Sequence, residues 1–413
     1  MRWLWIVLVL LSGPILAAQE PASLSPEEAT RAYLDRLSSE ERERSDSYAE
    51  GGYWLTLIDF LYGLGVAWVL LSTGISRQVR DWASRLTRIR ALSTALYAGV
   101  YILATALLSF PLTLYAGYFR EHRYGLSNQT LGPWLTERLT GLGVALVILG
   151  LLLVLLYAVF RRAPRSWWIG GTAVSLVMMV LTVLVAPVYI APLFNEYRPL
   201  SDSELRESIL SLARANGVPA DEVYEFDASR QSKRISANVS GLLGTMRISL
   251  NDNLLSRCSP EEVRAVMGHE LGHYVLNHVY EGVLFFGVLL LLGFAFLRWS
   301  FGAAQRRWGG RWGIEGIDDE AGLPLLAALL SVFFFAATPA VNSFIRANEA
   351  EADIFGLNAA REPEGFAEVS LKLSEYRKLD PGPIEEWLFF DHPSGRARIR
   401  MAMTWKEERQ AEK

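Results

Sequence analysis

The chain has 413 residues, of which 51% are hydrophobic, and its mean hydropathy is +0.20. This composition is too apolar for an ordinary soluble protein of this length. The formal net charge is −4 with dispersed basic residues, which argues against a nucleic-acid partner, and the single cysteine excludes an internal disulfide and a cysteine-based zinc cluster. We therefore expect a membrane protein.

The chain begins with a short apolar run at residues 4–17, after Met1-Arg2. Its end, Ala17-Ala18-Gln19, is typical of a signal-peptide cleavage site, but the run also suits a short first transmembrane helix. Both interpretations of residues 1–18 stay open. The acidic segment 19–50 follows, and four apolar side chains predict one face of a surface helix there: Leu24, Ala29, Tyr33 and Leu37.

Six further apolar stretches are long enough to cross a bilayer. They are residues 53–72, 92–115, 139–160, 167–190, 283–299 and 323–344. Arginines cluster in three alternating connections, at 73–91, 161–165 and 306–311, so these connections share one side of the membrane. The positive-inside rule makes that side cytoplasmic and places the other loops in the periplasm of a bacterial inner-membrane protein. We expect an N-terminal membrane domain at 19–190 and a second domain at 191–413 that includes the last two spans.

The largest polar segment, residues 191–282, predicts mixed helix and strand. A cap at 201–204 opens an amphipathic helix with Leu205, Ile209, Leu212 and Ala213 on one face, and Asn216-Gly217 ends it. Alternating residues at 222–227 predict a strand. Residues 236–243 and 246–251 predict an antiparallel pair that turns near Gly244-Thr245.

The next helix carries the pattern His269-Glu270-Leu271-Gly272-His273. Ser259 as the cap, Pro260 at the first turn and Glu262 predict where this helix begins. On a helix, His269 and His273 share a face and can bind one metal ion, while Glu270 can accept a proton from a metal-bound water. The alternative is a helix with two ordinary histidines. His278 falls on another face and is expected to be structural.

Catalytic zinc takes three protein ligands, so a third must come from elsewhere. The best candidate is the segment 342–356, in which Glu349 and Asp353 share a helical face. Glu349 would bind the metal, and Asp353 would orient a ligand histidine. The alternative is an acidic surface helix.

A further candidate element follows at His392-Pro393. His392 near zinc would stabilise an oxyanion, and Arg398 would hold a carboxylate or a backbone carbonyl. By pattern alone, a solvated histidine beside a basic turn is favoured.

At these residues the chain resembles the CAAX prenyl protease 1 family of integral-membrane zinc metalloendopeptidases. The resemblance extends over nearly the whole chain. It rests on the histidine pattern, on 124–130, 193–200, 236–241 and 247–250, on Pro339, Asn342, Ser343, Arg346, Glu349 and Asp353, and on His392-Pro393 with Arg398.

The resemblance implies a mainly α polytopic membrane protein whose seven transmembrane helices, residues 4–17 included, surround a water-filled chamber. A zincin-like α+β domain would hold one zinc ion through His269, His273 and Glu349, with Asp353 beside a ligand histidine. It implies that Asn238 contacts a substrate strand, for which we also predict Gly241 and Arg398 as binding residues.

The implied activity is zinc-dependent hydrolysis of peptide or membrane-associated protein substrates, with Glu270 as the base and His392 at the oxyanion. A membrane-protein quality-control protease shares the site and differs only in its substrate. The alternative from another class is a non-catalytic chamber for lipidic or peptide cargo with a structural zinc. It predicts a closed site with four ligands, for which no fourth strong ligand is evident.

Overall fold

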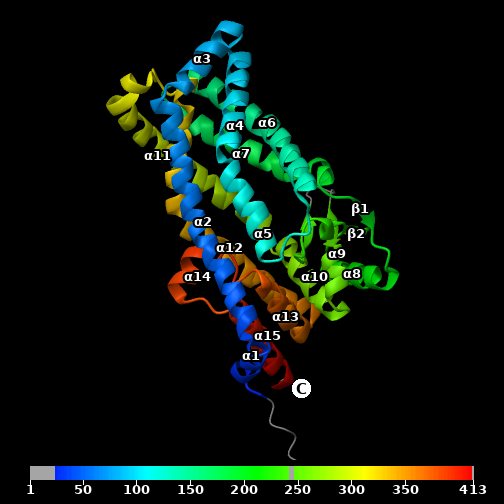
Figure 1. The fold of residues 1–413 in the computed structure, drawn as a ribbon. Helices are drawn as coiled ribbons and strands as arrows, with labels where there is room; N and C mark the ends of the chain where they lie inside the picture. The colour runs from blue at the N-terminus through cyan, green and yellow to red at the C-terminus, as the bar shows by residue number, and fades with distance from the viewer. Residues whose placement is uncertain (1–23, 241–245, 412–413) are drawn as a thin grey trace, which may run out of the picture.

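The computed structural model describes residues 24–240 and 246–411 (Figure 1). Within these ranges, six helical segments are long and apolar enough to cross a membrane, and they contain all six predicted stretches. They are α2 (Ser39–Ser72), α4 (Arg90–Leu114) continued by η1 (Tyr115–Phe119) and α5 (Arg120–Arg123), α6 (Leu131–Arg162), α7 (Trp167–Val185) continued by η2 (Ala186–Ile190) and η3 (Ala191–Leu193), α11 (His278–Trp312), and α12 (Leu323–Ala360) preceded by η5 (Glu320–Gly322).

These six helices leave most of their apolar surface uncovered by the rest of the described chain. At most 33% of the apolar window of each is buried inside the chain. Such exposed apolar surface is expected of helices that face lipid. The predicted additional span at residues 4–17, and the question of its cleavage, lie outside the described residues.

The surface helix predicted within 19–50 is only partly correct. The structure places α1 at Pro26–Leu34, and a second capping box, formed by Ser38 and Glu41, then starts α2, so the remaining acidic residues begin the first membrane-spanning helix. The apolar residues Ala29, Tyr33 and Leu37 pack on the C-terminal core between α13 and α15, whereas Leu24 is exposed. The helix therefore docks on the chain and is not a free surface element.

The three arginine-rich connections meet at one end of the membrane helices. Arg80 on α3 (Ile75–Leu86) donates to the Asp319 carboxylate at 2.7 Å and to the carbonyl of Gly313 at 3.2 Å. Arg161, at the end of α6, lies 3.1 Å from the Glu320 carboxylate. These contacts agree with the prediction that the connections share one side. That this side is cytoplasmic stays a prediction.

A four-stranded sheet lies beside the membrane helices, in the order β1-β2-β4-β3. The strands are β1 (Tyr197–Pro199), β2 (Val223–Phe226), β3 (Ala237–Ser240) and β4 (Arg247–Asn251). β4 is parallel to β2 and antiparallel to β3, with Asn238 opposite Ser249. The predicted antiparallel pair is confirmed, and its turn at Gly244-Thr245 lies outside the described residues. β3 is an edge strand.

The predicted helix after residue 201 forms as α8 (Ser203–Ala215), but its cap differs from the prediction. The Asp202 carboxylate, and not Ser201, accepts from the backbone N–H groups of Glu204 and Leu205, both at 3.0 Å. The aspartate carries the stronger acceptor for those amides. The helix buries Ile209, Leu212 and Ala213 under the sheet and ends before Gly217, whose φ is +72°.

The remaining helices complete the polar domain. They are η4 (Ala228–Arg230), α9 (Asp252–Arg257), α10 (Pro260–Val275), α13 (Pro363–Lys372), η6 (Leu373–Glu375), α14 (Pro383–Phe389) and α15 (Gly395–Ala411). α10 packs along the end of α12 and touches β3 and α13. It therefore lies at the junction of the membrane helices and the sheet, and its motif faces that junction.

Candidate metal centre

The predicted start of the motif helix is confirmed. The N–H of Glu262 donates to Ser259 Oγ at 3.3 Å, and the N–H of Ser259 donates to the Glu262 carboxylate at 2.7 Å, with Pro260 in the first turn. This reciprocal cap fixes where the helix begins. It therefore fixes which residues of α10 face α12.

Small residues allow α10 and α12 to approach closely. A Cβ on Gly268 would lie 2.9 Å from the carbonyl oxygen of Gly356, and a Cβ on Gly356 would lie 2.8 Å from the backbone nitrogen of His269. Gly272 lies similarly close to Ala352, because a Cβ on Gly272 would be 3.2 Å from the Cα of Ala352. Larger residues would push the helices apart, and the acidic face of α12 would no longer reach the two histidines.

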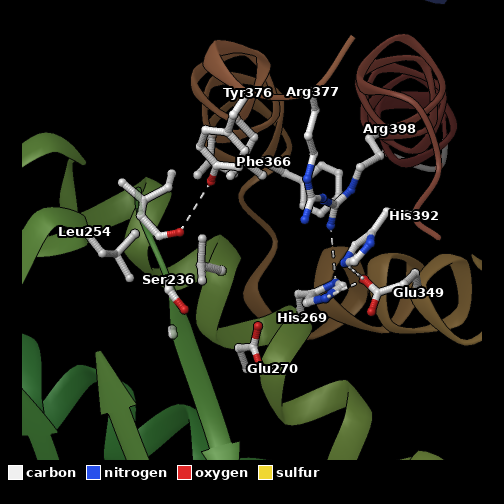
Figure 2. A pocket seen from close by; sticks show the side chains of 15 residues that line it. Ser236, Leu254, His269, Glu270, Glu349, Phe366, Tyr376, Arg377, His392 and Arg398 are labelled. Atoms are coloured by element: carbon white, nitrogen blue, oxygen red, sulfur yellow. Dashed lines mark hydrogen bonds and ion pairs between the residues drawn. The ribbon is translucent and has the colours of Figure 1, made fainter. Parts of the chain in front are cut away.

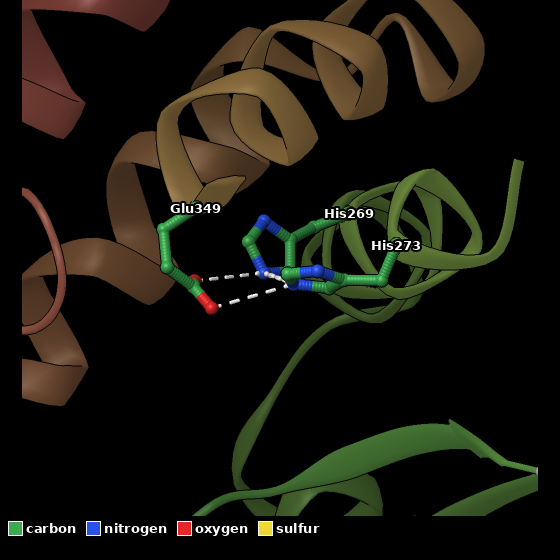
Figure 3. Close-up of side chains that lie close together, drawn as sticks. All are labelled: His269, His273 and Glu349. Carbon is green, nitrogen blue, oxygen red and sulfur yellow. Dashed lines mark hydrogen bonds and ion pairs between the residues drawn. The ribbon is translucent and has the colours of Figure 1, made fainter. Parts of the chain in front are cut away.

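Three side chains from the two helices converge on one point (Figure 3). The Nε2 atoms of His269 and His273 are 3.1 Å apart. Oε2 of Glu349 lies 3.3 Å from Nε2 of His269, and its Oε1 lies 3.4 Å from Nε2 of His273. One donor atom from each residue lies within 4.8 Å of the others. The structure thus brings together the three predicted ligands.

The donor set fits a divalent transition metal. Each histidine is already held through its other ring nitrogen, so the two Nε2 atoms are free to direct lone pairs at one position. Glu349 Oε2 is buried without a hydrogen-bond partner among the described residues. Two imidazoles and a carboxylate that leave one position open are the ligands of catalytic zinc.

His269 is oriented by a buried carboxylate. Its Nδ1 lies 2.7 Å from Oδ1 of Asp353, a fully buried residue, and Arg398 Nε donates to the other Asp353 oxygen at 2.9 Å. Burial by itself lowers the pKa of His269, but the carboxylates of Asp353 and Glu349 beside its two ring nitrogens outweigh burial and raise the pKa to about 9. The predicted position of Asp353 agrees with the structure. Arg398 holds a carboxylate, as predicted, and that carboxylate is Asp353, which it binds with two nitrogens. Its contact with substrate stays a prediction.

His273 is oriented by a residue that the sequence argument set aside. Its Nδ1 lies 2.9 Å from Nδ1 of His278, which is buried. The prediction that His278 is merely structural on another face assumed one continuous helix. Instead α10 ends at Val275, and Asn277, at φ +63°, turns the chain into α11 so that His278 folds back. Burial and the nearby His269 lower the pKa of His273 to about 4.

Glu270 lines a cavity of about 260 Å³ together with two of the ligands, His269 and Glu349 (Figure 2). Burial raises the pKa of its carboxyl to about 7. A carboxyl with a pKa near neutrality can both take and give a proton. A bound cation would lower this pKa and favour the ionised form that a base needs.

His392 also lies at the site, contrary to the solvated histidine that its pattern favoured. Its Nε2 is 3.2 Å from Glu349 Oε2, and its Nδ1 is 2.7 Å from the Asp391 carboxylate. α12 holds the preceding segment: Asn342 donates to the carbonyl of Leu388 at 2.7 Å, and Arg346 donates to that of Glu386 at 3.0 Å. These contacts explain why polar residues occur in α12 just before Glu349.

The edge strand β3 borders the same cavity. Ser236 and Ala237 line it, and neither was predicted. Val239 and Ser240 line a second cavity of about 730 Å³, which also touches His273. Asn238 lies on β3 between these two pairs, and the predicted Gly241 lies outside the described residues. The cavities therefore flank the metal ligands along one strand edge.

Comparison with known proteins finds two family models that match the chain. A family model described as peptidase family M48 matches residues 199–406. A second, described as the CAAX prenyl protease N-terminal region with five membrane helices, matches residues 21–196. Together they cover most of the chain.

Several relatives are similar over much of their length. The uncharacterized metalloprotease YhfN of Bacillus subtilis is 31% identical over 83% of this chain and 82% of its own. CAAX prenyl protease 1 of Saccharomyces cerevisiae is 29% identical over 61% of this chain and 58% of its own. The crystal structure of S. mikatae Ste24p superposes with a TM-score of 0.76 at 24% identity, covering 92% of this chain and 95% of that one, and shows the fold.

Proposed function

We propose the following mechanism from the premise that this chain belongs to peptidase family M48 and is an integral-membrane metalloprotease resembling CAAX prenyl protease. His269, His273 and Glu349 hold one zinc ion. When bound, zinc supplies Lewis-acid polarisation of the scissile carbonyl and of a water molecule. The observation that carries this proposal is the convergence of these three ligands on one point, next to the cavity that Glu270 lines.

The chain's own residues then move protons and hold charge. Glu270 takes the proton of the attacking water and delivers it to the leaving amine. His392 donates to the oxyanion that develops on the carbonyl oxygen. Asp353 and His278 orient the two ligand histidines, and Arg398 orients Asp353.

The substrate is a peptide or a membrane-associated protein that adds to β3 in an extended conformation. The backbone groups on the open side of this edge strand, near Asn238, pair with it. The arginine-rich end of the membrane helices faces the cytoplasm, which puts the catalytic side in the periplasm of a bacterial inner membrane. A role in membrane-protein quality control uses the same site on misfolded substrates. Trapping substrates on a Glu270→Gln variant distinguishes the two.

The test is Glu270→Gln in the purified, zinc-loaded full chain, assayed on a quenched peptide. We expect kcat to fall by about 10²- to 10⁴-fold, because a general base is removed, while elemental analysis still finds bound metal. The matched control is Glu261→Gln, which changes an exposed carboxylate on the same helix and should retain activity. Wild-type activity in Glu270→Gln would exclude Glu270 as the base.

The non-catalytic alternative receives no support from the comparisons, and the described residues provide three ligands and not four. One assay separates it from the peptidase. If the chain is a zinc peptidase, a chelator should abolish cleavage of the quenched peptide, and added zinc should restore it. If the metal-loaded chain cleaves no peptide, the structural-zinc alternative is favoured.

A further inference from the structure

Arg377 directs a guanidinium group into the active-site cavity. It lies in the segment between η6 and α14 and lines both the cavity that contains Glu270 and an adjoining cavity of about 320 Å³. Its side chain is half-buried, and Figure 2 shows it entering the cavity toward the metal ligands. It is therefore within reach of a molecule bound there.

The guanidinium of Arg377 differs from those of its neighbours because it has no partner among the residues that the structure describes. Arg398 is bound to Asp353, and Arg346 is bound to backbone carbonyls. Within the described ranges, the Arg377 guanidinium makes no hydrogen bond or ion pair. Asp391 lies near enough to feel its charge, but that carboxylate bonds to His392.

The backbone of Arg377 is nevertheless held in place. Ser45 Oγ on α2 donates to its carbonyl at 3.1 Å. The preceding residue, Tyr376, is mostly buried against the cavity wall, and its hydroxyl lies 3.5 Å from the carbonyl of Ile235. A fixed backbone with an unpaired charged end is suited to binding a ligand, because little ordering remains to be done.

The chemistry of the missing partner follows from the guanidinium. Its planar fork matches a carboxylate with two parallel hydrogen bonds, and a partly desolvated cation is stabilised by such a pair. The chain direction of the bound peptide follows from β3. A peptide that pairs antiparallel with β3 would run, from its N terminus to its C terminus, from the Ser240 end toward Ala237. Its C-terminal residues would then reach Ser236 and the Arg377 side of the cavity.

We propose that Arg377 binds a carboxylate of the peptide substrate on the C-terminal side of the scissile bond, and thereby selects substrates that carry one. This inference rests on the proposed peptidase function and adds a specificity to it. The carboxylate is either the α-carboxylate of a substrate chain end or the side chain of an Asp or Glu. Both sources offer the same two oxygens to the guanidinium.

The test uses two matched peptide pairs with the zinc-loaded full chain in detergent. One pair differs only in a free or amidated C terminus, and the other pair, amidated, differs in Asp or Asn after the scissile bond. We expect the wild type to favour the carboxylate in at least one pair by about 10- to 100-fold in kcat/KM, the range for a hydrogen bond to a charged group. The pair that shows it identifies the source.

Arg377→Gln should remove this preference, mainly through KM, and Arg377→Lys should retain part of it because the charge stays while the fork is lost. The control is Arg400→Gln, an exposed arginine on α15 that lines none of these cavities. Metal content and thermal midpoint are measured for each variant. They should match the wild type, since Ser45 contacts only the Arg377 backbone.

A binding experiment separates this proposal from the proposed function. Labelled versions of the four peptides are titrated against Glu270→Gln and against Glu270→Gln with Arg377→Gln, with fluorescence anisotropy as the readout. Equal binding of carboxylate and amide peptides, or a preference that survives Arg377→Gln, overturns the role of Arg377. Absence of cleavage by the wild type counts against the peptidase function alone, because the binding comparison still decides the role of Arg377.

Discussion

The helix α12, together with the turn before it, carries buried acidic residues at both ends, and the two ends differ in how these acids are satisfied. At the arginine-rich end, Asp319 accepts from Arg80 at 2.7 Å and from the N–H groups of Glu315 and Ala321, each at 2.9 Å. Glu320 accepts from Thr94 at 2.7 Å and lies 3.1 Å from an Arg161 nitrogen. The chain itself therefore supplies the donors and positive charge that these carboxylates need.

At the other end, the chain leaves one carboxylate incompletely satisfied. Asp353 is bound by Arg398 and His269, as completely as the acids of the far end. Glu349 Oε2 is buried without a hydrogen bond in the described part of the chain, and it faces Nε2 of His269 at 3.3 Å and Nε2 of His392 at 3.2 Å. Buried acids alone thus do not indicate a metal site. The indication is a buried acid that faces several imidazole nitrogens aimed at one position, because a metal ion there can replace the protons of those rings.

The sharpest test of this comparison replaces one glutamate by glutamine at each end of α12, so that a carboxylate becomes an amide. Glu349→Gln should lose most of the bound metal, from about one ion per chain, because an amide is a poor zinc ligand. Glu320→Gln should keep the metal but lower stability by about 1–3 kcal/mol, because Arg161 loses its partner. Elemental analysis and thermal unfolding of both variants give the result. Metal retention in Glu349→Gln would exclude Glu349 as the third ligand.

The second prediction concerns pH and separates the two histidines. With a pKa raised to about 9, metal-free His269 carries a proton at pH 7, whereas His273, with a pKa lowered to about 4, does not. In the Glu270→Gln variant, which removes the other carboxyl that titrates near pH 7, metal binding must therefore release about one proton at pH 7, and affinity should rise about tenfold per pH unit up to pH ~9. Calorimetry in buffers of different ionisation enthalpy measures this proton. Release of no proton, or of two, would contradict the assignment.

The third prediction concerns the support of His269. Asp353→Asn removes the charge that fixes this ring and leaves Arg398 buried without its counterion. We expect metal affinity to fall by about 10- to 100-fold, the usual cost of losing a carboxylate behind a ligand histidine. Competition with a chromogenic chelator measures the affinity. The far-end variant Asp319→Asn, which breaks an equally buried pair with Arg80, should leave the affinity unchanged.

The smallest expected effect concerns the support of His273, whose partner is neutral. His278→Ala should lower metal affinity by about tenfold, because the ring loses one hydrogen bond and no charge. His278→Asn should restore much of it, since an amide oxygen can accept near the position of Nδ1. An alanine variant with full affinity, or an asparagine variant no better than alanine, would show that His278 does not position His273.

Local sequence patterns were sufficient to predict several parts of the molecule. The six apolar stretches predicted six long helices, since length and hydropathy suffice to recognise a membrane span. The Ser259 cap placed the start of α10, and four-residue spacing placed His269 with His273 and Glu349 with Asp353. Such patterns depend only on helical geometry, so they needed no knowledge of the rest of the fold.

The failures arose where an element ends or where two elements meet. The sequence places Glu349 and Asp353 on one face of α12 but does not say which helix that face meets. Gly268 and Gly356 decide this, because their contact lets α10 approach α12. Asn277, in the left-handed conformation, turns the chain so that His278 lies beside His273. The packing of α15 places Arg398 against Asp353.

By itself, the sequence therefore determined that this is a membrane protein with a metal-binding pair of histidines on a well-capped helix. Only the tertiary structure decided which carboxylate faces them, what holds each ring, and which guanidinium the described residues leave unpaired in the cavity. The physical reason is the sequence separation over which each kind of interaction acts. Periodicity and capping act within a few turns of one helix, whereas close packing and charge pairing depend on residues that are distant in the chain.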